Sequence, residues 1–149
     1  MNNLQADRVV DGRKGECRGN QVLNNIFFAC PQRVYLGRND SNLCNGNVYD
    51  AGDQGGLFDI QEPAPRPQPH LDTWQTVFGQ DKRSVETAMQ AEFDPAKSQL
   101  HFSCGTVPET CVPVAPLGEE TPTLLPGPFG AEAWNLLRDG KQVVLALPE

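Results

Sequence analysis

The first 60 residues of the chain repeat at a spacing of 22 positions. Each copy carries an asparagine followed directly by an aliphatic residue. The three copies are Asn2-Asn3-Leu4, Asn24-Asn25-Ile26 and Gly46-Asn47-Val48. Because a polar and an apolar position repeat together, the segment is predicted to consist of equivalent structural units placed side by side.

The repeating segments predict short β-strands. They contain Val, Ile, Phe and Tyr and are interrupted by Asn, Gly and Asp, whereas helical repeats need longer units with a 3.6-residue apolar period. Units stacked about 4.8 Å apart would place residues 22 positions apart directly over one another. Leu4, Ile26 and Val48 would then form one interior aliphatic stack, and Val22 with Cys44 another.

The recurring asparagines allow two interpretations. Asn tolerates a left-handed backbone, so Asn3, Asn25 and Asn47 suit a recurring turn in which stacked amides bond to one another. The alternative is a polar stripe that binds sugar or calcium. We favour the turn, because backbone geometry alone explains asparagine at the repeat spacing.

Residues 50–69 are rich in Gly and Pro, and the repeat stops there. Leu57-Phe58-Asp59-Ile60 predicts a last strand. The prolines at 63, 65, 67 and 69 predict an extended connector outside any strand ladder.

The second half of the chain predicts short elements separated by irregular segments. A helix is expected from Asp72 as N-cap to a stop at Gly79, with Trp74, Val77 and Phe78 on its apolar face and Trp74 in a packing role. Residues 93–97 predict a strand end and a turn. The later expectations are a strand around His101 with Leu100 and Phe102 facing inward, an irregular proline-containing stretch, a helix over 130–137 and a strand over 143–147.

The charge pattern excludes several classes of partner. Lys and Arg number 12 against 19 Asp and Glu, for a net charge of −7. Nucleic acid and anionic membranes need a positive surface, so neither is expected as a partner. No apolar run is long enough to span a bilayer, and the first 30 residues lack the pattern of a secretory signal.

The five cysteines leave the redox environment open. Cys104 and Cys111 flank a turn segment and could form a disulfide loop, but two free thiols explain the spacing equally well. There is no CxxC pair, and His70 and His101 are far from the cysteines in sequence. We therefore predict no metal site and no cofactor.

No catalytic residue can be assigned from the sequence, so whether the chain is an enzyme stays open. A glycoside hydrolase needs two carboxylates facing one another. The candidates Asp40, Asp50, Asp53 and Asp59 lie in the repeat region, but the residues one unit away from Asp40, Asp50 and Asp59 are Arg18, Phe28 and Gly37. The candidate lyase bases Arg18, Arg33 and Arg38 are interpreted as solvated surface charges.

Three groups of residues resemble a known family. They are Asn24-Asn25-Ile26-Phe27-Phe28, then Gly46-Asn47-Val48-Tyr49, then the series Leu71-Asp72-x-Trp74-Gln75, Gly79-Gln80-Asp81, Ser84 and Phe93-Asp94-Pro95. With these features, residues 1–102 resemble the C-terminal coils of right-handed parallel β-helix proteins of the pectate-lyase-like superfamily. The family often has His before the serine, where this chain has Arg83, and a later Ser-Pro-Ala segment that this chain lacks.

The resemblance implies an all-β fold. It would be a right-handed parallel β-helix stub of about three coils over residues 1–62, followed by a connector, a short tryptophan helix and an irregular C-terminal cap over 63–149 of the same domain. In such proteins the tryptophan helix and the Phe-Asp-Pro turn help to close the end of the β-helix.

The resemblance also implies a class of function. Family members include polysaccharide lyases, hydrolases and epimerases, so the first hypothesis is the C-terminal segment of a polysaccharide-active protein without a complete catalytic site, in an extracytoplasmic location. The alternative is a non-catalytic structural or glycan-binding module. Because Met1 enters the repeat partway through a unit, we expect self-association or missing upstream coils to cover that edge.

Overall fold

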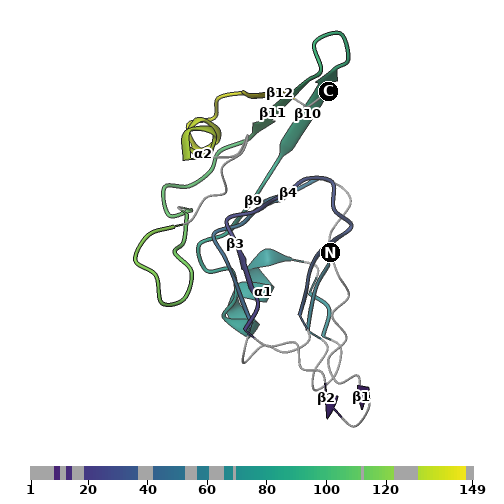
Figure 1. Cartoon of the computed structure of the whole chain (residues 1–149), viewed down its shortest axis with the longest axis vertical. Coiled ribbons are helices and arrows are strands. Elements are labelled where there is room, and N and C mark those ends of the chain that lie inside the picture. Colours follow the sequence, from purple (N-terminus) through teal and green to yellow (C-terminus); the bar gives the residue numbers. More distant parts are fainter. Residues whose placement is uncertain are drawn as a thin grey trace.

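The computed structural model describes residues 9–10, 13–14, 19–36, 42–52, 57–60, 66–68, 70–111, 113–122 and 131–146. Within these ranges the fold is mainly β, with five small sheets and two short helices (Figure 1). The predicted all-β class is therefore confirmed at the level of a mainly-β chain. One of the five sheets is a small antiparallel pair near the N-terminus, formed by β1 (Val9–Val10) and β2 (Arg13–Lys14).

Two copies of the repeat pair in parallel. The first copy supplies β3 (Gln21–Leu23), β4 (Ile26–Phe27) and β5 (Gln32–Leu36), and the second supplies β6 (Leu43–Asn45), β7 (Val48–Asp50) and β8 (Leu57–Ile60). Each strand of the first copy pairs with its counterpart in the second.

The 22-residue register is confirmed for the first two strand pairs. Val22 lies over Cys44, and Ile26 lies over Val48. Leu4, the third expected member of the aliphatic stack, is outside the described residues.

The third strand pair departs from the register. Asp59 lies beside Tyr35, a spacing of 24, and not over Gly37 as a constant spacing predicted. The shift arises because the second copy has a longer connection between its second and third strands, and the pairing is irregular between Gln32 and Val34.

The expected β-helix of about three coils is wrong. Among the described residues, parallel pairing at or near the repeat spacing joins two levels, and each pair of strands belongs to a separate small sheet. The next strand on β7 is β9 (Val85–Thr87), which pairs Val85 with Val48 after an intervening helix. Beyond β9 the chain forms an antiparallel sheet, so the described residues contain no stack of regular parallel coils.

The proline segment also differs from the prediction of a connector outside any strand ladder. The N–H of Phe58 donates to the carbonyl of Gln68 at 2.9 Å, and the N–H of Gln68 donates to the carbonyl of Phe58 at 2.7 Å. Residues 66–68 therefore run antiparallel along the outer edge of β8. Pro67 fits there because it lies between the residues whose N–H groups bond to β8, and its missing N–H removes no bond from that edge.

The core has two clusters on opposite sides of β7. Tyr49, Phe58 and Trp74, each 0% exposed, lie in one cluster, between the strands of the repeat and the helix α1 (Leu71–Phe78). Val48 faces the other cluster, which the C-terminal segment covers, and Ile26 packs there as well. Ile26 and Val48 therefore do not lie in the cluster between the repeat strands and α1, as an interior stack would. They lie on the opposite face of these strands, and both faces are covered.

Helix α1 matches the predicted span but not every predicted contact. The helix ends at Gly79, whose φ is 68°, as expected of a glycine stop. His70 and not Asp72 is the N-cap residue, since the helix begins two residues earlier than predicted. Trp74 packs in the core as predicted, whereas Val77 is 56% exposed because the helix packs on the core through Leu71, Trp74 and Phe78.

The C-terminal helix and strands lie close to their predicted positions, but the strands form a three-stranded antiparallel sheet where an irregular cap was expected. β10 (Met89–Asp94) and β11 (Gln99–Cys104) form a hairpin, and β12 (Val143–Ala146) pairs with β11. Phe102 is buried and Leu100 packs against the same cluster. Helix α2 (Ala131–Arg138) contributes Leu137 to this cluster; the side chain of Trp134 lies outside the described residues.

We expect Phe58→Ala to lower the free energy of unfolding by about 3–5 kcal/mol, because it leaves a cavity in a fully buried aromatic cluster. The Phe58 ring stacks on Trp74 at 5.4 Å between centroids and meets Tyr49 edge-on at 4.9 Å. Chemical denaturation followed by tryptophan fluorescence measures the change. The control is Val77→Ala on exposed helix surface, expected within about 0.5 kcal/mol of the unsubstituted chain; equal effects of the two substitutions would contradict this packing.

Candidate functional site

The outer edge of β6 is closed by two consecutive residues. The N–H of Cys44 donates to Gln80 Oε1 at 2.8 Å, and Gln80 Nε2 donates to the carbonyl of Asn42 at 2.9 Å. The N–H of Asp81 completes the edge by donating to the carbonyl of Cys44 at 2.7 Å. One buried carboxamide and one peptide group thus replace a neighbouring strand.

The other two strands of the second copy are closed as well. β9 pairs with β7 in parallel, and residues 66–68 pair with β8. All three strands of this level therefore have partners on the side away from the first copy, each of a different kind.

Asp81 is the centre of a buried polar network. Its side chain accepts four hydrogen bonds: from Asn47 Nδ2 at 2.8 Å, Ser84 Oγ at 2.5 Å, Tyr49 Oη at 3.1 Å and Trp74 Nε1 at 2.9 Å. Asp81 is 1% exposed. This carboxylate links the second copy of the repeat, helix α1 and the segment before β9.

Burial dominates the acid–base behaviour of this network. It raises the pKa of Asp81 from 3.8, and the four hydrogen bonds offset part of that rise. Burial and the neighbouring Asp81 charge raise the pKa of the Cys44 thiol and of the Tyr49 phenol. A strongly perturbed cluster of this kind can mark an active site. Here no reacting molecule can reach the carboxylate, and each of its oxygens already accepts two hydrogen bonds.

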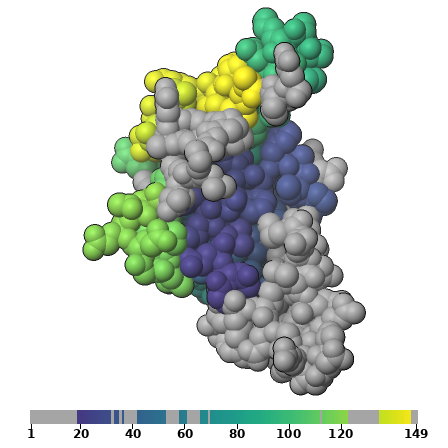
Figure 2. Space-filling model, in the orientation of Figure 1, coloured from purple at the N-terminus to yellow at the C-terminus, as the bar shows by residue number. Residues whose placement is uncertain are grey.

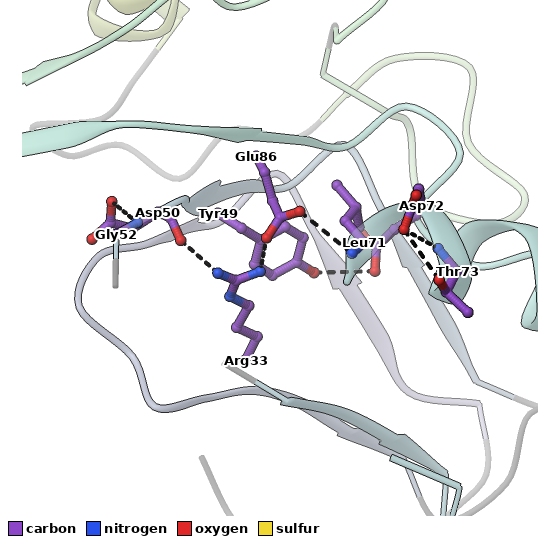
Figure 3. A network of polar contacts seen from close by, with 9 residues as sticks. Arg33, Tyr49, Asp50, Gly52, Leu71, Asp72, Thr73 and Glu86 are labelled. Atoms are coloured by element: carbon purple, nitrogen blue, oxygen red, sulfur yellow. Dashed lines mark hydrogen bonds and ion pairs between the residues drawn. The ribbon is translucent and has the colours of Figure 1, made fainter. Parts of the chain in front are cut away.

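Arg33 is buried, contrary to its interpretation as a solvated charge. Its guanidinium pairs with Glu86 and donates to the carbonyl of Asp50 at 2.6 Å (Figure 3). The other oxygen of Glu86 accepts from the N–H of Leu71 at 3.4 Å, at the start of α1. The guanidinium also lies 5.4 Å from the centre of the Phe58 ring. A paired, aromatic-lined position accounts for burial of this charge.

The two remaining candidate residues that the structure describes, Asp50 and Asp59, bond to backbone N–H groups. Asp50 accepts from the N–H groups of Ala29, Gly52 and Met89, and Asp59 accepts from the N–H of Arg66. Both carboxylates therefore have a structural role as acceptors for backbone N–H groups. Four other candidates lie outside the described residues: Arg18, Arg38, Asp40 and Asp53.

The cysteines and histidines form no metal-binding group in the part of the chain that the structure describes. Cys104 and Cys111 are free thiols that pack in the same core cluster. His70 precedes α1, while His101 lies on β11 beside Gln142. No group of metal-binding side chains occurs among the described residues, and none of the described helices is long and apolar enough to cross a membrane.

An amide ladder connects the two copies of the repeat. Asn47 Oδ1 accepts from the N–H of Asn25 at 2.9 Å and from Asn25 Nδ2 at 3.3 Å. Asn42 Oδ1 accepts the same two bonds from Asn20, both at 3.0 Å. The predicted bonding between stacked amides is thus confirmed for Asn25 and Asn47.

The left-handed residue of the turn is one position earlier than predicted. Asn24 has a φ of 57° and Gly46 a φ of 67°, and these two residues are one repeat apart. Asn25 and Asn47 instead follow the turn, where their side chains reach along the ladder. Asn3, the third residue of this prediction, lies outside the described part of the chain.

The first copy presents an open edge. Within the described ranges, no strand pairs with β3, β4 or β5 on the side away from the second copy. Because the carbonyl of Asn25 accepts from the N–H of Val48 at 2.9 Å, the N–H and C=O of Ile26 point to the opposite side. The same alternation points the N–H of Gln21 outward, since the carbonyl of Asn20 accepts from Leu43.

The C-terminal tail flanks this copy without pairing to its strands. Asn24 exchanges two side-chain hydrogen bonds with the backbone of Val114, at 2.7 and 2.9 Å, and Gln21 Oε1 accepts from the N–H of Leu117 at 2.8 Å. Figure 2 shows the tail in light green beside the purple residues of the first copy.

Comparison with known proteins gave no match to any protein-family model, to any curated protein or to any solved structure. Together with the separate parallel and antiparallel sheets, this result overturns the resemblance to the pectate-lyase-like superfamily. The repeat spacing was a real structural signal, but it joins two copies among the described residues, which are too few to specify that fold.

Sequence reasoning missed Gln80, Asp81 and Glu86 as structural residues. Gln80 and Asp81 were noticed only as parts of a motif, and their partners in the repeat are more than 30 positions away. The available signal for Asp81 was its position seven residues after Trp74, because a buried carboxylate needs donors such as an indole N–H.

We expect Asp81→Asn to lower the free energy of unfolding by about 1–3 kcal/mol. The hydroxyls of Ser84 and Tyr49 can turn, but Asn47 Nδ2 and Trp74 Nε1 only donate, so the new amide NH₂ must face one of them. Chemical denaturation tests this against Glu92→Gln, which neutralises an exposed carboxylate on β10 and is expected to change stability by less than about 0.5 kcal/mol. Equal stability of the Asp81→Asn variant and the unsubstituted chain would refute the donor arrangement.

Proposed function

We propose that this chain is a non-catalytic structural module, which ends a short run of parallel strands on one side and pairs with a further strand on the other. The observation that supports this role is the difference between the two edges. Every strand of the second copy has a partner on its outer side, whereas no described strand covers the first copy.

The buried polar residues support a structural role. Asp81, Arg33 and Gln80 resemble functional residues by type and burial, but each one bonds to groups of the protein itself. The polysaccharide-related hypothesis depended on the family resemblance, so we do not carry it into the proposal.

The open edge has the chemistry of a strand-pairing surface. Outward-pointing N–H and C=O groups alternate along β3 and β4, and the half-buried side chains of Val22, Ile26 and Phe27 lie on the same strands. An unpaired edge with apolar side chains favours association with another strand.

We expect the purified chain to self-associate as its concentration rises, because no strand of the described residues covers the outer edge of the first copy. Sedimentation velocity measures this association. Gln21→Pro removes one outward N–H and is expected to weaken association, whereas Gln21→Thr keeps that N–H and loses the same contact to Leu117.

Two results would contradict the proposed role. A chain that stays monomeric from dilute to concentrated solution would show that the edge does not pair. Saturable binding of a neutral or acidic polysaccharide would indicate a ligand-binding role in place of a structural one.

A further inference from the structure

Asn45-Gly46 is the only place in the sequence where an asparagine precedes a glycine. In such a pair, the backbone nitrogen of the second residue can attack the carboxamide carbon of the asparagine. Glycine has no Cβ, so it leaves that nitrogen unobstructed. The attack closes a cyclic imide and releases the side-chain nitrogen as ammonia. The sequence therefore contains one asparagine at which the side chain and the main chain can readily react.

The structure holds the two reacting groups together. The N–H of Gly46 donates to Asn45 Oδ1 at 3.0 Å, so the nitrogen lies beside the carboxamide that it must attack. Asn45 is the last residue of β6, and Gly46, with a φ of 67°, makes the turn towards β7. Because strands fix this turn on both sides, the contact is preformed, and reaching the attack geometry costs less entropy than in a free chain.

A second donor polarises the same carboxamide. The N–H of Arg83 donates to Asn45 Oδ1 at 2.8 Å, from a turn that the N–H of Ser84 closes by donating to the carbonyl of Asp81. When the Gly46 nitrogen attacks, negative charge develops on this oxygen. A backbone donor already within hydrogen-bond distance stabilises that charge without rearrangement of the protein. The segment that closes the edge of β6 therefore also activates Asn45.

The other described asparagines of the repeat lack this arrangement. After three of them, the N–H of the next residue bonds between the two copies, so its nitrogen cannot attack without breaking the ladder. These N–H groups belong to Asn25 after Asn24, to Leu43 after Asn42 and to Val48 after Asn47. After Asn20 and Asn25, the side chains of Gln21 and Ile26 obstruct the nitrogen.

We infer that Asn45 is a site of deamidation, at which water converts the carboxamide to a carboxylate and ammonia is released. The Gly46 nitrogen bonds to Cγ of Asn45, the bond from Cγ to Nδ2 breaks, and the proton of the Gly46 N–H leaves with the ammonia. Water then opens the imide. Addition of water at Cγ gives aspartate, and addition at the main-chain carbonyl carbon gives isoaspartate. This inference goes beyond the proposed structural role and does not rely on it.

The two products differ in their effect on the repeat. Aspartate keeps an oxygen for the N–H groups of Gly46 and Arg83, so the turn is retained. Isoaspartate directs the main chain through the former side chain and lengthens it by a methylene group just before the turn. Asn47 and Val48 then shift relative to the first copy, and the hydrogen bonds from Asn25 to Asn47 are lost. Deamidation therefore weakens the pairing of the two copies as the protein ages.

Peptide mapping of the folded chain tests this inference. After incubation in mildly alkaline buffer, tandem mass spectrometry locates each asparagine that has exchanged NH₂ for OH, and chromatography separates the aspartate and isoaspartate products. A synthetic peptide of residues 42–50 shows the reaction of the same pair without the fold. Gly46 is buried, which slows loss of its proton, but the preformed contact and the Arg83 donor offset this. We expect the folded chain to react at Asn45 within about tenfold of the rate in the peptide.

Two variants serve as controls. Asn45→Gln keeps a carboxamide but must close a larger ring, so we expect no product at that position. Asn45→Asp carries the charge of the product on an unaltered main chain. We expect Asn45→Asp to unfold at the same denaturant concentration as the fresh unsubstituted chain, and the aged chain, which contains isoaspartate, to unfold at a lower one.

Three outcomes would overturn the inference. Reaction of the folded chain more than about tenfold slower than the peptide would mean that the fold protects Asn45. Equal reaction at Asn42 or Asn47 would mean that the contacts of Gly46 and Arg83 do not select the site. An aged chain that contains isoaspartate but unfolds together with Asn45→Asp would refute the loss of pairing.

Discussion

The N–H and C=O groups along a strand edge need hydrogen-bond partners when they are buried, and this need explains most of the polar residues in the structure. The second copy of the repeat meets it in three ways. The side-chain amide of Gln80 bonds to the edge of β6, the parallel strand β9 pairs with β7, and an antiparallel segment around Pro67 pairs with β8. A regular coil would have met the need with a third set of strands. The chain uses different groups at each edge, and this is why the parallel pairing ends there.

Closing the edge in this way has a cost in desolvation, and the Asp81 network offsets it. A carboxylate held away from water is unfavourable unless strong donors surround it. Asn47, Tyr49, Trp74 and Ser84 provide four, and they come from the repeat, from α1 and from the segment before β9. The same carboxylate therefore fixes the position of three elements. Arg33 and Glu86 act in a similar way between the repeat and the start of α1.

Local signals in the sequence predicted the elements well. The asparagine and aliphatic positions gave the register of Val22 with Cys44 and of Ile26 with Val48, and Gly79 gave the end of α1. The register follows from the spacing between two copies of one motif, and the helix end follows from a single glycine. The mainly-β class, the turn over residues 93–97 and the strand around His101 followed from the same kind of pattern.

Contacts between distant segments could not be predicted. Nothing near Gln80 in the sequence indicates that it bonds to Cys44. Arg33 was interpreted as a surface charge because its partners, Glu86 and the aromatic rings, are distant from it in the sequence. Because β7 has apolar residues on both faces, the sequence did not indicate which core cluster Ile26 and Val48 would join. The family resemblance failed for the same reason, because a spacing shared by two levels does not specify how the third is built.

One edge of the paired strands is closed, and no strand of the described residues covers the other edge. Residue-resolved amide hydrogen exchange distinguishes the two edges by comparing Cys44, whose N–H bonds to Gln80, with Ile26, whose N–H points outward from β4. We expect strong protection of the Cys44 amide and rapid exchange of the Ile26 amide in dilute solution. An Ile26 amide as well protected as that of Cys44 would contradict this expectation.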